Sequence, residues 1–152
     1  MFQRPARDAV AFRVPDGEPV TYGELHERAA ALAARLRAAG IAAGDRRALG
    51  AGRPRVPLPA LGVLAARATA APLNSALTED GFAFYLEDLA PRVLLLPNEG
   101  LAPARAEAAA TAVAVLELDG ATHAGSDALE ERQPHDVAHL LHTSGTTSRL
   151  KP

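Results

Sequence analysis

Apolar residues recur at helical spacing between residues 25 and 39, and this is the clearest pattern in the chain. They follow steps of four, three, four and three, which places them on one face of a helix: Leu25, Ala29, Leu32, Leu36 and Ala39. Just upstream, Thr21 and Glu24 have capping-box spacing, in which each side chain bonds a backbone N–H of the first turn. The pattern predicts a helix that begins near Thr21, ends at Gly40 and serves packing.

Shorter apolar runs alternate with further helical segments along the rest of the chain. The runs predict strands at residues 10–14, 69–73, 93–96, 113–118 and 137–142. Helices are expected at about 60–68, from Thr78 to just before Pro91, and at 103–112. Such alternation is typical of an α/β fold with a mainly parallel sheet and flanking helices. At 152 residues, we expect one domain or a part of a larger one.

Residues 46–59 interrupt this alternation. The stretch holds three prolines, two glycines and four arginines in fourteen residues, a composition that predicts neither a strand nor a helix interior. We therefore expect Gly50 to Pro59 to be poorly ordered. The arginines could form a basic patch, but no aromatic residues lie between them, which favours a solvated stretch.

Composition narrows the function classes. Hydrophobic residues make up 48% of the chain but aromatic residues only 4%, and many of the rest are alanines, so the core is modest. A net charge of −2 argues against a nucleic-acid partner or an anionic membrane surface. No cysteine is present for a disulfide or a thiolate. With no signal peptide and no apolar run of spanning length, we expect a soluble, cytoplasmic protein.

Three histidines, His135, His139 and His142, lie near the C-terminal end of the sequence. On a helix, His135 and His139 would share a face, as some zinc ligands do. The apolar run at 137–141 instead favours a strand, which turns His139 and His142 to opposite faces. No carboxylate or cysteine completes a ligand set, so we expect no metal site. No residue stands out as a general acid, general base or nucleophile either.

The last eleven residues carry the main candidate chemistry. They come directly after the apolar run at 137–141 and are rich in hydroxyls around Gly145, which allows a tight turn that points backbone N–H groups at an anion. Lys151 adds a point charge suited to phosphate. The predicted phosphate-binding residues are Thr143, Ser144, Gly145, Thr146, Thr147, Ser148 and Lys151.

Two other interpretations of this loop have to be compared with phosphate binding. It is not a Walker A motif, because Leu150 and Pro152 flank the lysine where that motif needs glycine and Ser/Thr. Clusters of Ser, Thr and Gly also occur in ordinary turns. The strand before the loop favours the phosphate interpretation, because ligands of parallel sheets bind at the carboxyl ends of the strands.

Taken together with three further motifs, this loop makes the chain resemble the start of an adenylate-forming enzyme of the acyl-CoA synthetase family. Residues 143–151 resemble the family's T-S-G-T-T-x-x-P-K phosphate loop. Thr21-Tyr22-Gly23-Glu24-Leu25 resembles its T-Y-x-E-L helix start, Gly44-Asp45-Arg46 its G-D-R/V turn, and Ala71-Pro72-Leu73-Asn74 its A-P-L-N strand end. Residues 66–74, 82–88 and 141–149 are similar to the oxalate–CoA ligase branch, with His142 and Arg149 as branch markers.

The resemblance implies a two-step ligation. A carboxylate, for this branch oxalate or another small acid, attacks the α-phosphate of ATP, and the thiol of CoA then displaces AMP from the acyl-adenylate. The predicted phosphate loop would hold the phosphates in line and neutralise their growing charge. ATP with Mg²⁺ and CoA are the implied cofactor and co-substrates. The family's adenine-binding segment, magnesium-binding glutamate and C-terminal domain have no counterpart in residues 1–152.

The chain also departs from the family pattern. The family has a strand where this chain has Gly50 to Pro59, and Leu150 and Pro152 replace the loop's proline and following glycine. We expect residues 1–152 to be a partial N-terminal (AMP-binding) domain that ends inside the phosphate loop and is inactive alone, and a complementing chain could supply the rest. The alternatives are a non-catalytic nucleotide-binding or regulatory module and a decayed reading frame without function.

Overall fold

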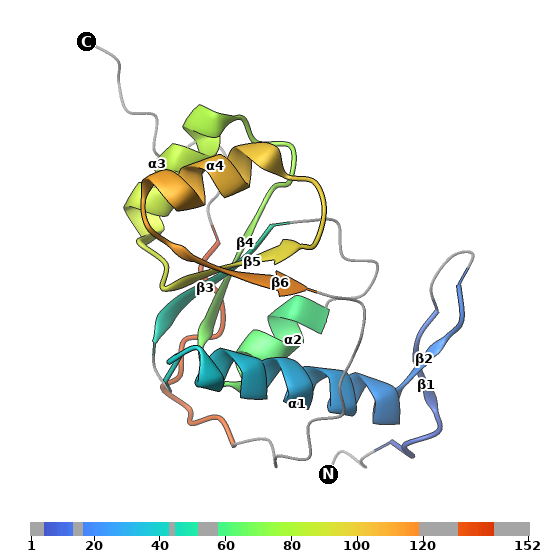
Figure 1. Ribbon diagram of the computed structural model, residues 1–152. Helices are drawn as coiled ribbons and strands as arrows, with labels where there is room; N and C mark the ends of the chain where they lie inside the picture. The colour runs from blue at the N-terminus through green and yellow to red at the C-terminus, as the bar shows by residue number, and fades with distance from the viewer. Residues whose placement is uncertain (1–4, 14–16, 43–44, 52–57, 119–130, 142–152) are drawn as a thin grey trace.

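A four-stranded parallel sheet lies between two layers of helices. The computed structural model describes residues 5–13, 17–42, 45–51, 58–118 and 131–141. The sheet has the order β4-β3-β5-β6, with strands β3 (Arg46–Ala51), β4 (Thr69–Leu73), β5 (Val93–Pro97) and β6 (Ala114–Leu118). Helices α1 (Tyr22–Ala38) and α2 (Leu58–Ala65) cover one face, and α3 (Glu79–Leu89) and α4 (Ala102–Ala110) cover the other (Figure 1). The predicted α/β class is confirmed.

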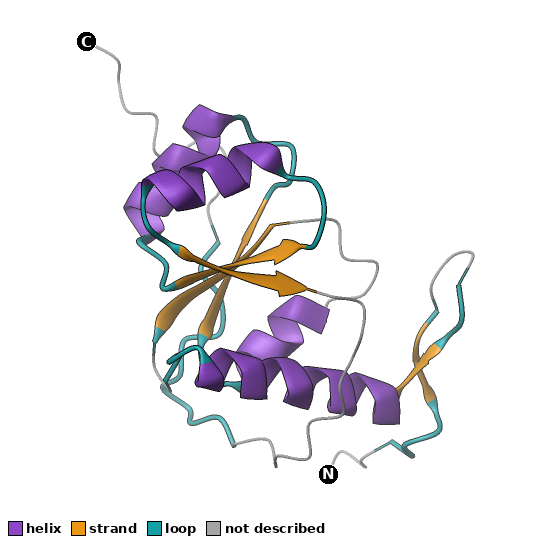
Figure 2. Ribbon diagram, in the orientation of Figure 1, coloured by secondary structure: helices purple, strands orange, loops and turns teal. Residues whose placement is uncertain are grey.

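The strand β5 contributes buried side chains to the core on both faces of the sheet. Its run Val-Leu-Leu-Leu is fully buried, and successive side chains point to opposite faces. Val93 and Leu95 pack under α1 and α2, whereas Leu94 and Leu96 pack under α3 and α4. Figure 2 shows the two helix layers on either side of the strands. A continuous apolar run is what a parallel strand covered on both faces requires.

Helix α1 begins and ends as the sequence predicts. The Glu24 carboxylate accepts a hydrogen bond from the Thr21 N–H at 2.8 Å, and the Thr21 hydroxyl accepts one from the Glu24 N–H at 3.2 Å. These bonds, first the one from the Thr21 backbone, hold the pKa of the Glu24 carboxyl below its usual value. At the other end Gly40 adopts φ 80°, which stops the helix after Ala38.

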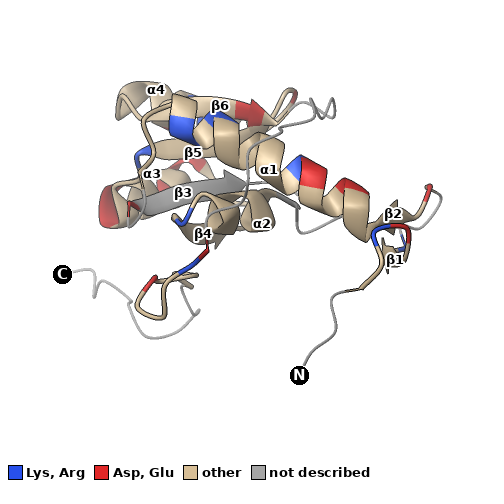
Figure 3. Cartoon of the chain, turned by 90° about the horizontal axis from the view of Figure 1, so that it is seen from below, with Lys and Arg blue, Asp and Glu red and all other residues tan. Residues whose placement is uncertain are grey.

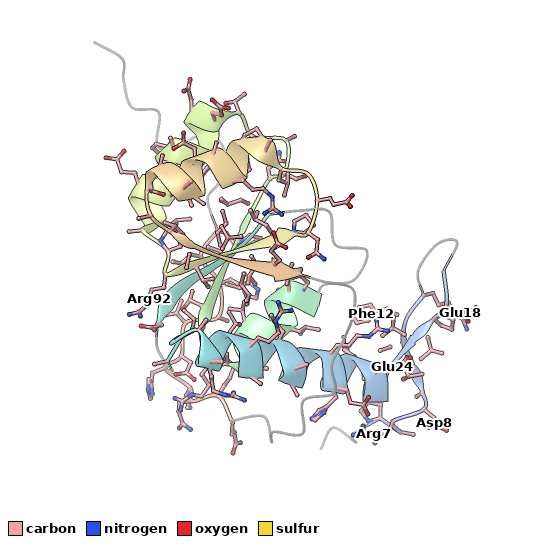
Figure 4. All side chains as sticks on the ribbon, in the orientation of Figure 1. Arg7, Asp8, Phe12, Glu18, Glu24 and Arg92 are labelled. Atoms are coloured by element: carbon pink, nitrogen blue, oxygen red, sulfur yellow. The ribbon has the colours of Figure 1, made fainter. Side chains whose placement is uncertain are left out.

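A short hairpin precedes α1. Strands β1 (Val10–Phe12) and β2 (Val20–Thr21) pair antiparallel. Arg7 beside the hairpin forms an exposed ion pair of 2.6 Å with Glu27 of α1. In Figure 4, Arg7 and Glu24 lie at the N-terminal end of α1, and Arg92 lies at its C-terminal end. Figure 3 shows acidic and basic residues interspersed along the same helix.

Helices α3 and α4 close the second face. The Thr78 hydroxyl caps α3 by accepting from the Gly81 N–H at 3.3 Å, and Phe82, Leu86 and Leu89 are buried, as the sequence predicts. Helix α4 is alanine-rich and buries only Ala104 and Ala108. In the described part of the chain, none of the helices combines the length and apolarity that crossing a bilayer requires.

The expectation for residues 46–59 is wrong over much of its length. Residues 46–51 form β3, which pairs with β4 on one side and β5 on the other. The three prolines begin only at Pro54, so every residue of β3 keeps the N–H that the ladder needs. Pro59 is the second residue of α2, where a missing N–H costs nothing. Gly50, Ala51, Leu58 and Pro59 therefore belong to regular elements, and residues 52–57 lie outside the described ones.

Other boundaries differ more modestly. The helix expected at 60–68 spans Leu58–Ala65, because Arg67 has φ 58° and ends it. The expected helix at 103–112 spans Ala102–Ala110 and the next strand begins at Ala114, because Ala112 has φ 54°. In place of a strand at 137–142, the described residues form one parallel bridge between His139 and Ala70. The expected strand at 69–73 is confirmed.

The close contact between α1 and α2 leads to a prediction about stability. A β-carbon on Gly62 of α2 would lie 2.5 Å from Cδ2 and 2.7 Å from Cβ of Leu32. We expect Gly62→Ala to lower the free energy of unfolding by about 2 kcal/mol, because overpacking outweighs the gain in helix propensity. Urea unfolding of Gly62→Ala, Leu32→Ala and the double variant checks this. The double variant should be more stable than the sum of the single effects implies, and strict additivity would contradict the clash.

Candidate phosphate-binding site

The candidate site lies at the carboxyl edge of the sheet. All four strands are parallel, so their C-terminal ends meet at one edge. The connection after β3 leads to α2 on one face, and the connection after β5 leads to α4 on the other. The connections therefore switch faces between β3 and β5, which are neighbours in the sheet. Open parallel sheets bind ligands in the crevice where the connections switch faces in this way. The loops that come after β4 and β5 both lie at this edge.

The segment 137–141 approaches the same edge along the outer side of β4. The Ala70 N–H donates to the Ala138 carbonyl at 2.9 Å, and the Leu140 N–H donates to the Ala70 carbonyl at 2.9 Å. This bridge is parallel, so the segment runs towards the carboxyl ends of the strands. Leu140 packs against the core under α3 and α4. The described chain thus leads to the sheet edge immediately before the predicted phosphate loop.

Four polar side chains tie this segment to the corner between α2 and β4, and we call them the corner clasp: Arg67, Thr69, Arg132 and Asp136. The Arg67 guanidinium binds both oxygens of the Asp136 carboxylate, at 2.9 and 3.2 Å. The Thr69 hydroxyl donates to the Val137 carbonyl at 2.8 Å. Arg132 donates to the carbonyls of Leu64, Ala68 and Val137 at 2.9 to 3.3 Å.

Asp136 is the most strongly perturbed carboxyl group among the described residues. The hydrogen bonds from Arg67 lower its pKa to about 2 from the usual 3.8, helped by the bond from the Gln133 N–H and by the charge of Arg132. Its side chain is 4% exposed and that of Arg67 is 20% exposed. Planar two-point pairing of this kind is geometrically specific as well as strong.

A third arginine, Arg105, fixes the loop after β5. Arg105 of α4 donates to the carbonyls of Pro97, Asn98 and Gly100 and forms an ion pair of 2.7 Å with Glu117 of β6. These bonds hold the end of β5 against α4. They are intramolecular and directed at the protein's own backbone, so we assign Arg105 to loop structure.

The predicted phosphate-binding residues 143–148 and 151 lie outside the described residues, as does His142. Of the other histidines, His135 and His139 are exposed. Within the ranges that the structure describes, no three His, Asp or Glu residues gather in a way that could hold a metal ion.

Sequence reasoning missed the corner clasp entirely. Arg67 and Asp136 are 69 positions apart, and neither belongs to a recognisable motif. One local signal existed: Arg67 comes directly after the apolar positions of a helix, where a left-handed residue is common and glycine is usual. An arginine in place of the usual glycine is the departure from pattern that the sequence offers there.

The geometry defines a class of protein. It is an α/β protein in which residues 137–141 run to the carboxyl edge of a parallel sheet, where nucleotide-binding enzymes hold their ligands, and in the sequence a Ser-, Thr- and Gly-rich segment follows them. The chain belongs to the AMP-binding enzyme family, whose model matches residues 2–152.

Curated relatives include both CoA ligases and peptide synthetases. The chain is 38% identical over 148 residues to oxalate–CoA ligase of Arabidopsis thaliana, covering 87% of this chain and 29% of that protein. It is 39% identical over 106 residues to a probable CoA ligase, CCL9, of Humulus lupulus, covering 60% and 20%. Tyrocidine synthase 3 of Brevibacillus parabrevis is 33% identical, covering 88% of this chain and 2% of that protein.

Solved structures of adenylate-forming enzymes share the fold. ATP-bound MatB from Rhodopseudomonas palustris superposes with a TM-score of 0.79 at 25% identity, covering 97% of this chain and 31% of that chain. The anthranilate CoA ligase AuaEII in complex with anthranoyl-AMP gives a TM-score of 0.76 at 17% identity, covering 91% and 29%. The chain therefore spans about a third or less of the relatives it matches.

The ion pair of the corner clasp yields a pH prediction. The pKa of Asp136 is about 2 in the folded chain, below its usual 3.8, so the pair stabilises the fold fully above about pH 5. That stabilisation is lost as the pH falls through the folded pKa. Asp136→Asn should therefore unfold at lower urea at pH 7 and lose part of the decline in stability between pH 5 and 3.

Urea midpoints measured from pH 7 to pH 3 check this prediction. Glu27→Gln, which breaks the exposed pair with Arg7, is the matched control and should change the profile little. An acid dependence in Asp136→Asn as steep as in the unaltered chain would contradict the assignment.

Proposed function

We propose that residues 1–152 form the N-terminal part of the AMP-binding domain of an ATP-dependent acid–CoA ligase. The enzyme activates a carboxylate as an acyl-adenylate, releases pyrophosphate and transfers the acyl group to CoA. A cytoplasmic location belongs to the same proposal, because the reaction draws on ATP and CoA.

The observation that carries the proposal is the path of the chain at the sheet edge. Residues 137–141 run parallel to β4 towards the carboxyl ends of the strands, and the sequence T-S-G-T-T-S-R-L-K begins two residues later. A Gly-centred run of hydroxyls at that edge supplies backbone N–H and O–H donors for phosphate oxygens. In the proposal, Thr143, Ser144, Gly145, Thr146, Thr147 and Ser148 surround the phosphates, and Lys151 neutralises charge that develops on pyrophosphate.

Magnesium accompanies ATP in this proposal. In the part of the chain that the structure describes, no three His, Asp or Glu residues gather to hold a metal ion, so we assign no metal ligand to these residues and no step to the metal. The chain's own contribution is to bind and orient the phosphates.

Oxalate or another small acid is the proposed substrate class. Support for this acid comes from the 38% identity with the Arabidopsis oxalate–CoA ligase. The probable CoA ligase of Humulus lupulus, at 39% identity, supports the CoA ligase class without indicating an acid. Peptide synthetases are also relatives, and the feature they share with the ligases in this proposal is carboxylate activation by ATP.

A graft tests the function directly. Residues 1–152 replace the corresponding segment of the Arabidopsis oxalate–CoA ligase, and formation of oxalyl-CoA from oxalate, ATP and CoA is measured. We expect activity in the graft and a loss of about a hundredfold in kcat/KM with Lys151→Ala, since one missing transition-state donor costs about that much. Arg7→Ala removes the same charge elsewhere and is the control. A folded graft without activity would contradict the proposal.

The isolated chain is expected to be inactive. A polypeptide of residues 1–152 covers 29% of the length of the Arabidopsis ligase, so it should form no acyl-CoA from oxalate, malonate or longer acids with ATP and CoA. Thioester formation is measured by chromatography of the CoA products. Any product above a blank without protein would show that these residues suffice.

The isolated chain should still bind MgATP weakly. A few charge-assisted hydrogen bonds of about 1.5–3 kcal/mol each, offset by the cost of ordering the loop, leave an affinity near or weaker than about 1 mM, or about −4 kcal/mol. Lys151 is the sole lysine of the sequence, so protection of its amine from acylation by MgATP reports occupancy at this position. Micromolar binding that Lys151→Ala abolishes would favour a stand-alone nucleotide-binding module instead.

A further inference from the structure

We propose that Arg67, Arg132 and Asp136 are positioning residues for the phosphate loop: by holding residues 137–141 in register along β4, they set where that loop begins. The inference rests on the proposed function for the loop's role, and on described contacts for the clasp itself. None of the three side chains is proposed to touch the nucleotide.

Apolar burial holds the segment 137–141 at Leu140 alone. Val137 is 43% exposed and Leu141 is 70% exposed, and Leu140 alone packs into a core cluster. Within the described residues, the segment shares one bridge with β4, made of two backbone hydrogen bonds. The polar clasp therefore supplies much of the attachment.

Arg67 makes this attachment from an unfavourable, left-handed backbone conformation. Helices α1, α2 and α4 each end two residues before a left-handed residue: Gly40 at φ 80°, Arg67 at φ 58° and Ala112 at φ 54°. A left-handed backbone is unfavourable for a residue with a side chain, and glycine avoids the penalty. At the end of α2, the arginine side chain reaches Asp136, which glycine could not do.

Arg132 and Thr69 fix the position along the strand. The Val137 carbonyl accepts from the Thr69 hydroxyl at 2.8 Å and from Arg132 at 3.1 Å. Arg132 also bonds the carbonyls of Leu64 and Ala68, at and just beyond the end of α2. A slip of one residue would break these bonds and turn Leu140 away from the core, because side chains alternate faces.

Register matters for the proposed chemistry. One residue of strand is about 3.3 Å, whereas a misplacement of about 1 Å is enough to impair catalysis or binding that depends on alignment. The clasp thus links the α2–β4 corner to the phosphate loop through the backbone of a five-residue segment.

The test uses the 152-residue chain and two glycine substitutions of the same kind. Arg67→Gly removes the guanidinium and relaxes a left-handed backbone, and Ala112→Gly relaxes the same conformation two residues after α4 without touching the clasp. Asp136→Asn is the second variant on the clasp. Amide exchange of Leu140 and Ala70 is followed by NMR, and magnesium pyrophosphate is titrated under conditions where every variant is folded.

We expect both clasp variants to exchange the Leu140 amide faster and to bind magnesium pyrophosphate at least about fivefold more weakly, the lower range of coupling between separate sites. Ala112→Gly should match the unaltered chain in both. Arg67→Lys, which keeps the charge but not the two-point geometry, should give an intermediate affinity.

The other possible outcomes would each overturn the clasp, its positioning role or both. Unchanged exchange at Leu140 in Arg67→Gly and Asp136→Asn would overturn the clasp. Faster exchange with unchanged pyrophosphate affinity would leave the clasp structural and overturn its positioning role. If the unaltered chain binds no pyrophosphate, the proposed phosphate loop fails and the positioning role with it, while the exchange data still report whether the clasp exists.

Discussion

The parallel ladder through β3 is the constraint on which the rest of the structure depends. This strand pairs with β4 and β5 at once, so it joins the two halves of the sheet. A parallel sheet needs both faces covered, and each crossover helix packs on the face to which its connection leads. The buried run Val93–Leu96 therefore faces α1 and α2 on one side and α3 and α4 on the other. The same parallel direction brings every strand end to one edge, which gives the edge its capacity to hold a ligand.

The core on both faces of the sheet is packed largely with small side chains. Alanines make up many of the buried residues, including Ala29, Ala33, Ala66, Ala68, Ala104 and Ala108. Alanine buries little area, so the helices must lie close to gain contact, and Gly62 against Leu32 is the tightest point of that packing among the described glycines. Polar attachments then contribute more at the periphery, as the corner clasp does for residues 137–141 and Arg105 does for the loop after β5.

The sequence correctly predicted the helix ends that are set by residues within a single turn. The capping box at Thr21, the glycine stop at Gly40 and the cap at Thr78 satisfy backbone groups within one turn, and all three are present. The strand β3 could not be predicted in this way, because its partners come from residues 20 or more positions away and its own sequence is poor in strand formers. The clasp could not be predicted for the same reason, since only the fold brings Arg67 to Asp136. The predicted phosphate loop rests on motif and position, and its residues lie outside the described ones.

Arg67 shows how stability and placement are balanced at one position. A left-handed arginine weakens the end of α2 relative to glycine, yet its guanidinium gains a nearly buried carboxylate with two well-aligned hydrogen bonds. If the pair served stability alone, glycine at this position with a neutral side chain at Asp136 would be the less strained solution. That solution lacks a fixed register for a segment with little apolar burial of its own. Ala112 adopts the same left-handed conformation without such a pair, so the feature particular to the end of α2 is the reach of the Arg67 guanidinium to Asp136, which attaches the segment leading to residue 141.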